Sequence, residues 1–188
     1  MSRTRRSVSA SPSRWQGARS CAKRIPLAAL TALAAVSVTA SALAAPPRAG
    51  TLVPGKQLGG LELGATRAQV NAQWGRRHGA CRDCRETTWY FNFRRFEPQG
   101  AGVSFRHGRA VALFTLWSPP DWRTNRGLAI GDPAARVAGI YGPALLRTTC
   151  TNYYALSLPR RHTTTAIYIF DNQVWGFALL ARGQRVCR

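Results

Sequence analysis

The chain has 188 residues, of which 27 are Lys or Arg and only 7 are Asp or Glu, giving a formal net charge of +20. The basic residues are scattered, whereas nucleic-acid-binding proteins usually concentrate them on one element, so the charge favours a generally basic surface over a dedicated polyanion site. The few acidic residues lie at no spacing that suggests a pair of catalytic carboxylates.

Residues 1–44 have the features of a secretory signal peptide. Seven basic residues and no acidic one accompany an apolar run from Ile25 to about Val38, which is too short to span a bilayer comfortably. Ala42-Leu43-Ala44 then provides the small residues of a cleavage site. We expect a secreted or extracytoplasmic protein without a membrane span after cleavage. An uncleaved anchor is the alternative, and the sequence leaves open which export route is used.

Cleavage after Ala44 leaves residues 45–188, enough for one compact domain or two small ones. Seven basic residues and no acidic ones are removed, so the formal charge falls by seven, from +20 to +13. Cys21 lies before the apolar run, where a lipid-bearing cysteine cannot sit, so we expect no acyl anchor.

Four cysteines remain, namely Cys81, Cys84, Cys150 and Cys187. In an oxidising compartment this even number predicts two disulfides, with three possible connectivities. We favour Cys81–Cys84 and Cys150–Cys187. The second bond would fasten the end of the chain and contribute about 3–4 kcal/mol to stability.

The stretch 60–75 occurs a second time at 127–142, and an internal repeat of this kind is a strong indication of architecture. The identical pairs are Gly60 and Gly127, Leu61 and Leu128, Gly64 and Gly131, Ala68 and Ala135, Val70 and Val137, and Gly75 and Gly142. Each copy predicts a short helix with one apolar face.

The ends of both predicted helices are marked by capping residues. In the first copy we expect Thr66 to cap the helix and Gly75 to end it. In the second copy we expect Asp132 as the cap, Pro133 as the first helical residue and Gly142 as the end.

Each predicted helix is followed by three predicted strands, rich in aromatic and β-branched residues. The strands are expected at 87–93, 102–105, 110–117, 152–158, 163–170 and 174–180, with tight hairpins at 106–109 and 171–172. The predicted fold is therefore α+β, with two tandem repeats that each pack a short helix on a three- to four-stranded antiparallel sheet. Five segments are expected, namely a signal peptide (1–44), a linker or N-terminal arm (45–59), repeat 1 (60–117), an inter-repeat connection (118–126) and repeat 2 (127–188).

The pattern Leu-Gly-x-x-x-x-x-Val-x-x-x-x-Gly at Leu63–Gly75, ahead of a small antiparallel sheet, resembles the small lipoproteins of outer-membrane assembly, the SmpA/OmlA group. Two such units in tandem, secreted and disulfide-bonded, resemble the β-lactamase inhibitory protein and its relatives. The resemblance rests on about sixteen residues per copy and on element order. It implies a concave sheet with helices behind it and a binding role. The chain lacks the lipid-bearing cysteine, and no partner-binding residues are carried over.

His78-Gly-Ala-Cys81-Arg-Asp-Cys84 is the sharpest local cluster of reactive side chains. A small disulfide loop is the interpretation we favour. A zinc site would need a fourth ligand such as His107, and a redox dithiol would be expected to open a helix after a strand. The sequence contains no Gly-x-Ser-x-Gly elbow and no phosphate-binding glycine loop. We therefore predict no catalytic residues, metal or cofactor.

Aromatic residues alternate along the predicted strands. Trp89 and Phe91 share the face expected under the helices, which leaves Tyr90 on the open face, and Tyr153 takes the same place in the second repeat. The candidate binding residues on this face and the crossing are Tyr90, Arg106, Trp117, Trp122, Tyr153 and Trp175. Exposed Tyr, Trp and Arg are typical of interface hot spots. The alternative is that these rings bury the junction between the repeats.

These observations predict a secreted, non-catalytic protein-binding module, with an inhibitor of an extracytoplasmic enzyme as one form of it. The expected partner is an extracytoplasmic protein with an acidic surface, because the net charge disfavours a basic one. The alternative is a basic adhesion protein that binds anionic cell-envelope polymers or nucleic acid non-specifically, with strong salt dependence.

Overall fold

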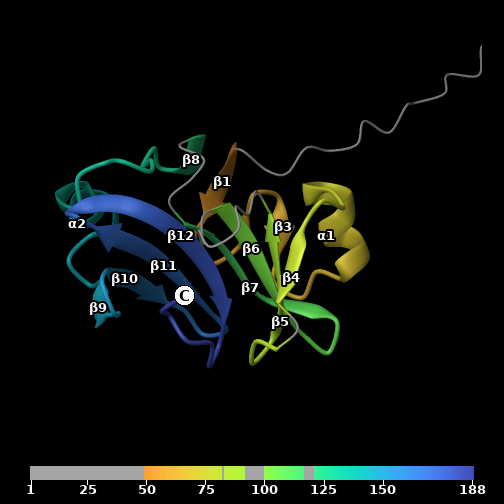
Figure 1. Ribbon diagram of the computed structural model, residues 1–188. Coiled ribbons are helices and arrows are strands. Elements are labelled where there is room, and N and C mark those ends of the chain that lie inside the picture. The colour runs from red at the N-terminus through yellow and green to blue at the C-terminus, as the bar shows by residue number, and fades with distance from the viewer. Residues whose placement is uncertain (1–48, 82, 92–99, 117–120) are drawn as a thin grey trace, which may run out of the picture. The chain divides into compact units, whose positions relative to one another are not determined.

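Strands make up most of the part of the chain that the structure describes. The computed structural model describes residues 49–81, 83–91, 100–116 and 121–188, so the predicted signal peptide lies outside it. The strands are β1 (Ala49–Val53), β2 (Gln57–Leu58), β3 (Leu61–Glu62), β4 (Gly79–Cys81), β5 (Thr87–Phe91), β6 (Gly100–Arg106), β7 (Arg109–Leu116), β8 (Asp121–Thr124), β9 (Leu146–Thr149), β10 (Tyr154–Pro159), β11 (Thr163–Phe170) and β12 (Gln173–Ala181). The helices are α1 (Arg67–Trp74) and α2 (Ala135–Tyr141) (Figure 1).

The largest element is one antiparallel sheet of eight strands, in the order β4-β5-β6-β7-β12-β11-β10-β9. Its two halves meet where β7 pairs with β12, from Leu116 opposite Gly176 to Ala112 opposite Leu180. Both strands consist largely of apolar residues that are buried in the protein. Because an unpaired edge of this kind would leave buried N–H and C=O groups without partners, pairing the two strands satisfies both backbones.

The predicted α+β fold of two tandem repeats is wrong, because the strands expected in two sheets form a single one. Strands β4 to β7 follow α1 and strands β9 to β12 follow α2, but the two sets form one sheet rather than two separate sheets with a helix each. The helices of the described residues are only eight and seven residues long, so the fold is mainly β. The sequence predicted the strands at 87–93, 102–105, 110–117, 152–158, 163–170 and 174–180 to within a few residues where the structure describes them.

A second, four-stranded sheet has the order β3-β2-β1-β8, in which β1 runs parallel to β8. Residues 49–58 were expected in a linker or arm, and 121–124 in the inter-repeat connection. They form strands because Leu52, Leu58 and Trp122 are fully buried in the same core. Strands of two to five residues are too short to produce a clear alternating pattern.

This core lies between the eight-stranded sheet on one side and the helices and small sheet on the other. Trp74 of α1 is fully buried in it, with its ring edge-on to Phe91 at 5.4 Å and to Trp122 at 6.0 Å between ring centroids. The Trp74 indole N–H donates to the Gly59 carbonyl oxygen at 2.9 Å. The polar edge of the buried ring is therefore satisfied while its apolar surface joins the two sheets.

The ends of α1 agree with the sequence. Thr66 Oγ1 accepts a hydrogen bond from the Gln69 N–H at 3.2 Å, and Gln69 Oε1 accepts one from the Thr66 N–H at 2.8 Å, which completes a capping box. Gly75 ends the helix with a φ of 89°, a conformation that favours glycine.

The predicted cap of α2 is wrong, although Gly142 does end this helix. The helix begins at Ala135, after Ala134, whose side chain makes no capping hydrogen bond. The Asp132 carboxylate instead accepts the Ala129 N–H at 2.8 Å, and its own backbone oxygen accepts the Val174 N–H. The other carboxylate oxygen accepts a hydrogen bond from the Arg136 side chain at 2.8 Å, so both oxygens have partners other than the first N–H groups of the helix.

Candidate binding site

The face of the eight-stranded sheet opposite the helices carries the candidate site. We call it the tail-side face, because the tail, residues 182–188, contacts it. Its buried residues are Ala112, Phe114, Leu116, Ala155, Ala166, Tyr168, Ala178 and Leu180, and Tyr90, Tyr153, Trp175 and Val186 pack against them. Half of these eight buried residues are alanines, so the larger side chains determine the shape of this face.

Phe114 forms the floor of the site. Tyr90, Gly102 and Phe114 lie opposite one another on β5, β6 and β7. A Cβ atom at Gly102 would collide with the Phe114 ring, so the glycine allows this ring to lie against the strand. Tyr90 packs edge-on to Phe114, with 6.1 Å between ring centroids. The result is an apolar surface between the sheet and the tail.

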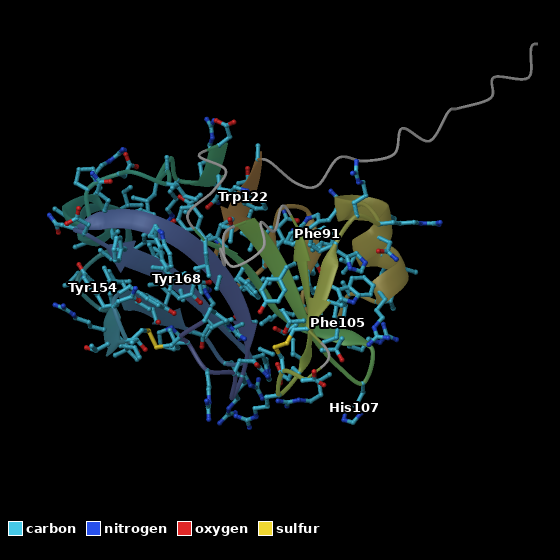
Figure 2. All side chains as sticks on the ribbon, viewed as in Figure 1. Phe91, Phe105, His107, Trp122, Tyr154 and Tyr168 are labelled. Atoms are coloured by element: carbon cyan, nitrogen blue, oxygen red, sulfur yellow. A yellow bond between two sulfur atoms is a disulfide. The ribbon has the colours of Figure 1, made fainter. Side chains whose placement is uncertain are left out.

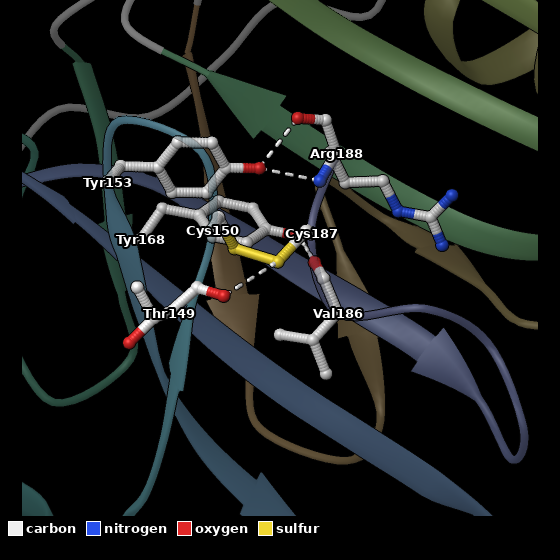
Figure 3. Close-up of a disulfide and its surroundings, with 7 residues drawn as sticks. All are labelled: Thr149, Cys150, Tyr153, Tyr168, Val186, Cys187 and Arg188. Atoms are coloured by element: carbon white, nitrogen blue, oxygen red, sulfur yellow. Dashed lines mark hydrogen bonds between the residues drawn. A yellow bond between two sulfur atoms is a disulfide. The ribbon is translucent and has the colours of Figure 1, made fainter.

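The tail is fixed to this face by covalent and polar contacts (Figure 3). The Cys150–Cys187 disulfide, with the Cα atoms 5.7 Å apart, ties it to the segment after β9. The Tyr153 hydroxyl donates to the Arg188 carbonyl oxygen and accepts from the Arg188 N–H, both at 2.6 Å. The buried Tyr168 hydroxyl donates to the Val186 carbonyl oxygen at 2.8 Å. These contacts place the side chains of the tail at defined positions over the sheet.

A pocket of about 240 Å³ opens between the tail and strands β5, β6 and β7. Tyr90, Phe114 and Leu116 form its apolar part. Its charged residues, among the described ones that line it, are Arg85, Glu86, Arg106, Arg185 and Arg188. Four arginines and a single carboxylate therefore line a pocket with an apolar floor, a combination that attracts an anionic group with an apolar part.

Glu86 is the acidic member of the pocket and is held by two other elements. Its Oε1 accepts a hydrogen bond from Arg106 at 2.6 Å and one from Gln184 of the tail at 3.0 Å. Burial raises the pKa of the carboxyl, but these hydrogen bonds and the charges of Arg106 and Arg188 outweigh it and lower the pKa below the ordinary value of 4.5. Glu86 is therefore ionised at neutral pH and neutralises Arg106.

Arg188 lies deeper than the other arginines of the pocket. Its guanidinium carbon lies 5.6 Å from the centroid of the Phe114 ring. Its Nη2 donates a long hydrogen bond of 3.5 Å to Gln184, and its buried Nε finds no hydrogen-bond partner among the described residues. An unpaired buried donor of this kind costs about 1–3 kcal/mol, so the pocket is set up to bind an acceptor.

Of the predicted binding residues, Tyr90 and Arg106 line this pocket. Tyr153 and Trp175 lie on the same face in a neighbouring aromatic group, with 5.2 Å between their ring centroids. Tyr90, Tyr153 and Trp175 all pack on the tail-side face, and Tyr153 bonds to the tail.

The two remaining predicted binding residues are Trp122, which the structure describes, and Trp117, which it does not. Trp122 is fully buried in the core on the opposite face, against Gly50 and Gly59, so it does not belong to a surface patch (Figure 2). It was misplaced because the crossing was read as irregular, whereas β8 turns this ring inward between the sheets. Trp117 lies outside the described residues.

Sequence reasoning missed the residues that the tail contributes to the pocket. Gln184, Arg185 and Arg188 line it, but they belong to no predicted strand. The signal that could have found them is Cys187, because a disulfide that fastens the tail to the sheet also brings its neighbours there. Phe114 was included in a predicted strand without being assigned to a face.

The His78–Cys84 cluster is structural in the described residues. Cys81 and Cys84 form a disulfide with the Cα atoms 5.5 Å apart, as the favoured interpretation predicted, and Cys150–Cys187 confirms the second predicted pair. The His78 ring stacks on Trp89 at 3.9 Å between centroids. No group of three His, Cys, Asp or Glu residues in the described part of the chain could hold a metal ion.

Comparison with protein families, curated proteins and solved structures found no match to this chain. Within the residues that the structure describes, no helix is both long enough and apolar enough to cross a membrane.

Proposed function

We propose that this protein is a secreted, non-catalytic binding module that engages the acidic surface of an extracytoplasmic protein through its tail-side face. Where the partner is an enzyme, inhibition is one consequence of such binding. The observation that carries the proposal is the pocket, which is lined by four arginines, one carboxylate and an apolar floor. Arginine and aromatic side chains are the usual anchors of protein interfaces, and a basic patch attracts an acidic one.

Export supports the same proposal. The first 44 residues have the pattern of a cleaved signal peptide, and the disulfides Cys81–Cys84 and Cys150–Cys187 suit an oxidising compartment. Because Cys187 belongs to the tail, oxidation also helps to build the pocket. The proposed binding site is thus one that would form completely only outside the cytoplasm.

Non-specific adhesion to anionic polymers is the competing function. It would use exposed arginines wherever they lie, such as the Arg76-Arg77 pair after α1 and the Arg160-Arg161 pair between β10 and β11. These pairs belong to different loops, whereas the pocket combines arginines from three segments around one apolar floor. The pocket is therefore the better candidate for selective binding.

Two double variants with the same change in charge test the proposal. The first is Arg185→Glu with Arg188→Glu in the pocket, and the second is Arg160→Glu with Arg161→Glu on the exposed loop. A protein captured from culture supernatant or envelope extract by the unmodified chain is purified, and its saturation binding to all three proteins is measured at low and moderate salt.

We expect saturable binding that persists at moderate salt, is lost in the pocket variant and is retained by the loop variant. Equal loss in both variants, together with a steep fall of binding as salt increases, would support polymer adhesion instead. The absence of any saturable binding at moderate salt would refute the proposal.

A further inference from the structure

Arg188 has hydrogen-bonding capacity that the protein itself leaves unused. In the same pocket, Arg106 is neutralised by Glu86 at 2.6 Å, and the amide of Gln184 also bonds to that carboxylate. Arg188 makes a long hydrogen bond of 3.5 Å with Gln184 and also interacts with the buried Tyr168 hydroxyl, but its buried Nε has no partner in the described part of the chain. The next acceptor to enter this pocket would therefore be bound best at Arg188.

The position of Arg188 is fixed before any ligand arrives. Its backbone N–H and carbonyl oxygen both bond to the Tyr153 hydroxyl at 2.6 Å, and the neighbouring Cys187 is held by the disulfide to Cys150. Its guanidinium lies over the Phe114 ring, which limits the directions it can point. A preorganised guanidinium loses little conformational freedom when it binds a carboxylate with two parallel hydrogen bonds.

The size of the pocket limits the ligand. At about 240 Å³ it is smaller than the usual pockets for small molecules, which occupy about 300–1000 Å³. A nucleotide or an oligosaccharide would exceed this space, whereas one acidic side chain with its apolar stem would fit. Leu116 and Phe114 offer that stem an apolar surface directly beside the guanidinium.

We infer that this pocket is a carboxylate socket that receives a glutamate side chain from the partner protein. Arg188 binds the carboxylate, and Phe114 and Leu116 contact the methylene groups and the adjacent apolar residue. The inference rests on the proposed function, because it names the chemistry by which the tail-side face recognises its partner.

The test uses two tripeptides that differ in charge but hardly in shape, acetyl-Leu-Glu-Leu-amide and acetyl-Leu-Gln-Leu-amide. NMR titration of the intact, disulfide-bonded protein follows the backbone amides of the tail and of β6. We expect saturable shifts with the glutamate peptide at millimolar concentration and about tenfold weaker binding of the glutamine peptide, since hydrogen bonds to a charged group are the stronger ones. Equal affinity for both peptides would overturn the inference.

Two arginine variants show whether Arg188 is the anchor. In Arg188→Gln the glutamate peptide should bind about tenfold less tightly, because the charged guanidinium that can form two parallel hydrogen bonds with a carboxylate is lost. Arg147→Gln is the matched control, since Arg147 also lies over an aromatic ring, that of Tyr154 at 4.0 Å, but does not line the pocket. Binding that survives in Arg188→Gln, or that weakens equally in Arg147→Gln, would refute the assignment.

A third probe, phenylacetate, separates the inference from the proposed function. Saturable binding of phenylacetate without binding of the glutamate peptide would mean that the socket takes a free acid, which overturns the inference. If neither probe binds but a captured partner still depends on the tail-side face, the proposed function stands and the socket is wrong. If the glutamate peptide binds at Arg188 but no partner uses this face, the socket stands and the proposed function fails.

Discussion

Glu86 connects three separate parts of the chain. It precedes β5, it pairs with Arg106 at the end of β6, and it accepts a hydrogen bond from Gln184 of the tail. Its side chain is only 12% exposed, whereas that of Arg106 is 49% exposed, so the pair lies at the boundary between the pocket and solvent. A single carboxylate thus links the tail, three residues before Cys187, to the segment that precedes β5.

The position of Glu86 predicts a pH dependence of stability. Because its pKa in the folded protein is lowered below 4.5, the stabilisation is present above that value and is lost as the pH falls through the folded-state pKa. Replacing Glu86 with Gln should reduce the free energy of unfolding at neutral pH by about 1 kcal/mol. The variant should also lose less stability than the original protein between neutral pH and the region below 4.5.

Urea unfolding at several pH values measures this difference, with Glu62→Gln as the control. Glu62 is an exposed residue of β3 and makes no ion pair in the described part of the chain. If both variants show the same stability at neutral pH and the same dependence on pH, the bridging role of Glu86 is wrong.

For single residues, the sequence predicts which face of a strand a side chain occupies better than it predicts whether that side chain is exposed to solvent. Alternation assigned Tyr90 and Tyr153 to the face opposite Trp89, and the structure places them there. Residue type alone suggested that Trp122 belonged with them, but β8 buries it in the opposite core. The difference is physical, because the face of Tyr90 follows from its alternation with Trp89 and Phe91, whereas the burial of Trp122 depends on the pairing of β8 with β1 in the small sheet.

At the scale of elements, turns and caps were predictable where one residue type is needed. His107 and Gly108 have φ values of 51° and 75°, and Asp171 and Asn172 have φ values of 46° and 58°, as tight hairpins require. The N-terminus of α2 was not predictable, because the Asp132 carboxylate binds Ala129 and Arg136 and its backbone oxygen binds Val174 of the distant strand β12.

Gly176 lies at the seam where β12 pairs with β7, and we expect its substitution to lower the stability of the protein strongly. A Cβ atom at Gly176 would collide with the carbonyl oxygen of Thr115, which belongs to the backbone and cannot rotate away. Gly176→Ala should therefore destabilise the protein by about 1–3 kcal/mol or more, by forcing the two strands apart. Thermal unfolding monitored by circular dichroism measures the change.

Gly139→Ala in α2 is the control for that variant. An added Cβ at Gly139 meets nothing within 4 Å, and alanine is the better helix former, so this variant should be unchanged or up to about 1 kcal/mol more stable. A Gly176→Ala protein as stable as the Gly139→Ala protein would show that the seam is not tightly packed.

At the scale of the whole molecule, the sequence did not predict that the two sets of strands would join into one sheet. The stretches 60–75 and 127–142 each precede four strands of the large sheet, but the repeat does not encode what the last strand of each set pairs with. Both β7 and β12 have apolar residues on their two faces. Such strands can pair with each other in one sheet, or each can be buried within a sheet of its own. The choice depends on register across the seam, where Gly176 leaves room for the neighbouring backbone. The pocket depends on the same long-range assembly.

The two disulfides should differ in importance, because they close loops of very different length. Cys150 and Cys187 are 37 positions apart, whereas Cys81 and Cys84 are 3 apart. Loop-closure entropy predicts a loss of about 4 kcal/mol for the double alanine variant of the first pair and about 2 kcal/mol for that of the second, measured by chemical unfolding.

The first variant should also free the tail locally. Burial raises the pKa of Tyr168, whose hydroxyl bonds to Val186 of the tail, so release of the tail should bring this pKa closer to the ordinary value of 10.0. Alkaline titration of tyrosine absorbance at a temperature where both variants remain folded measures this shift. An unchanged titration in the Cys150 and Cys187 variant would mean that hydrogen bonds alone hold the tail on the sheet.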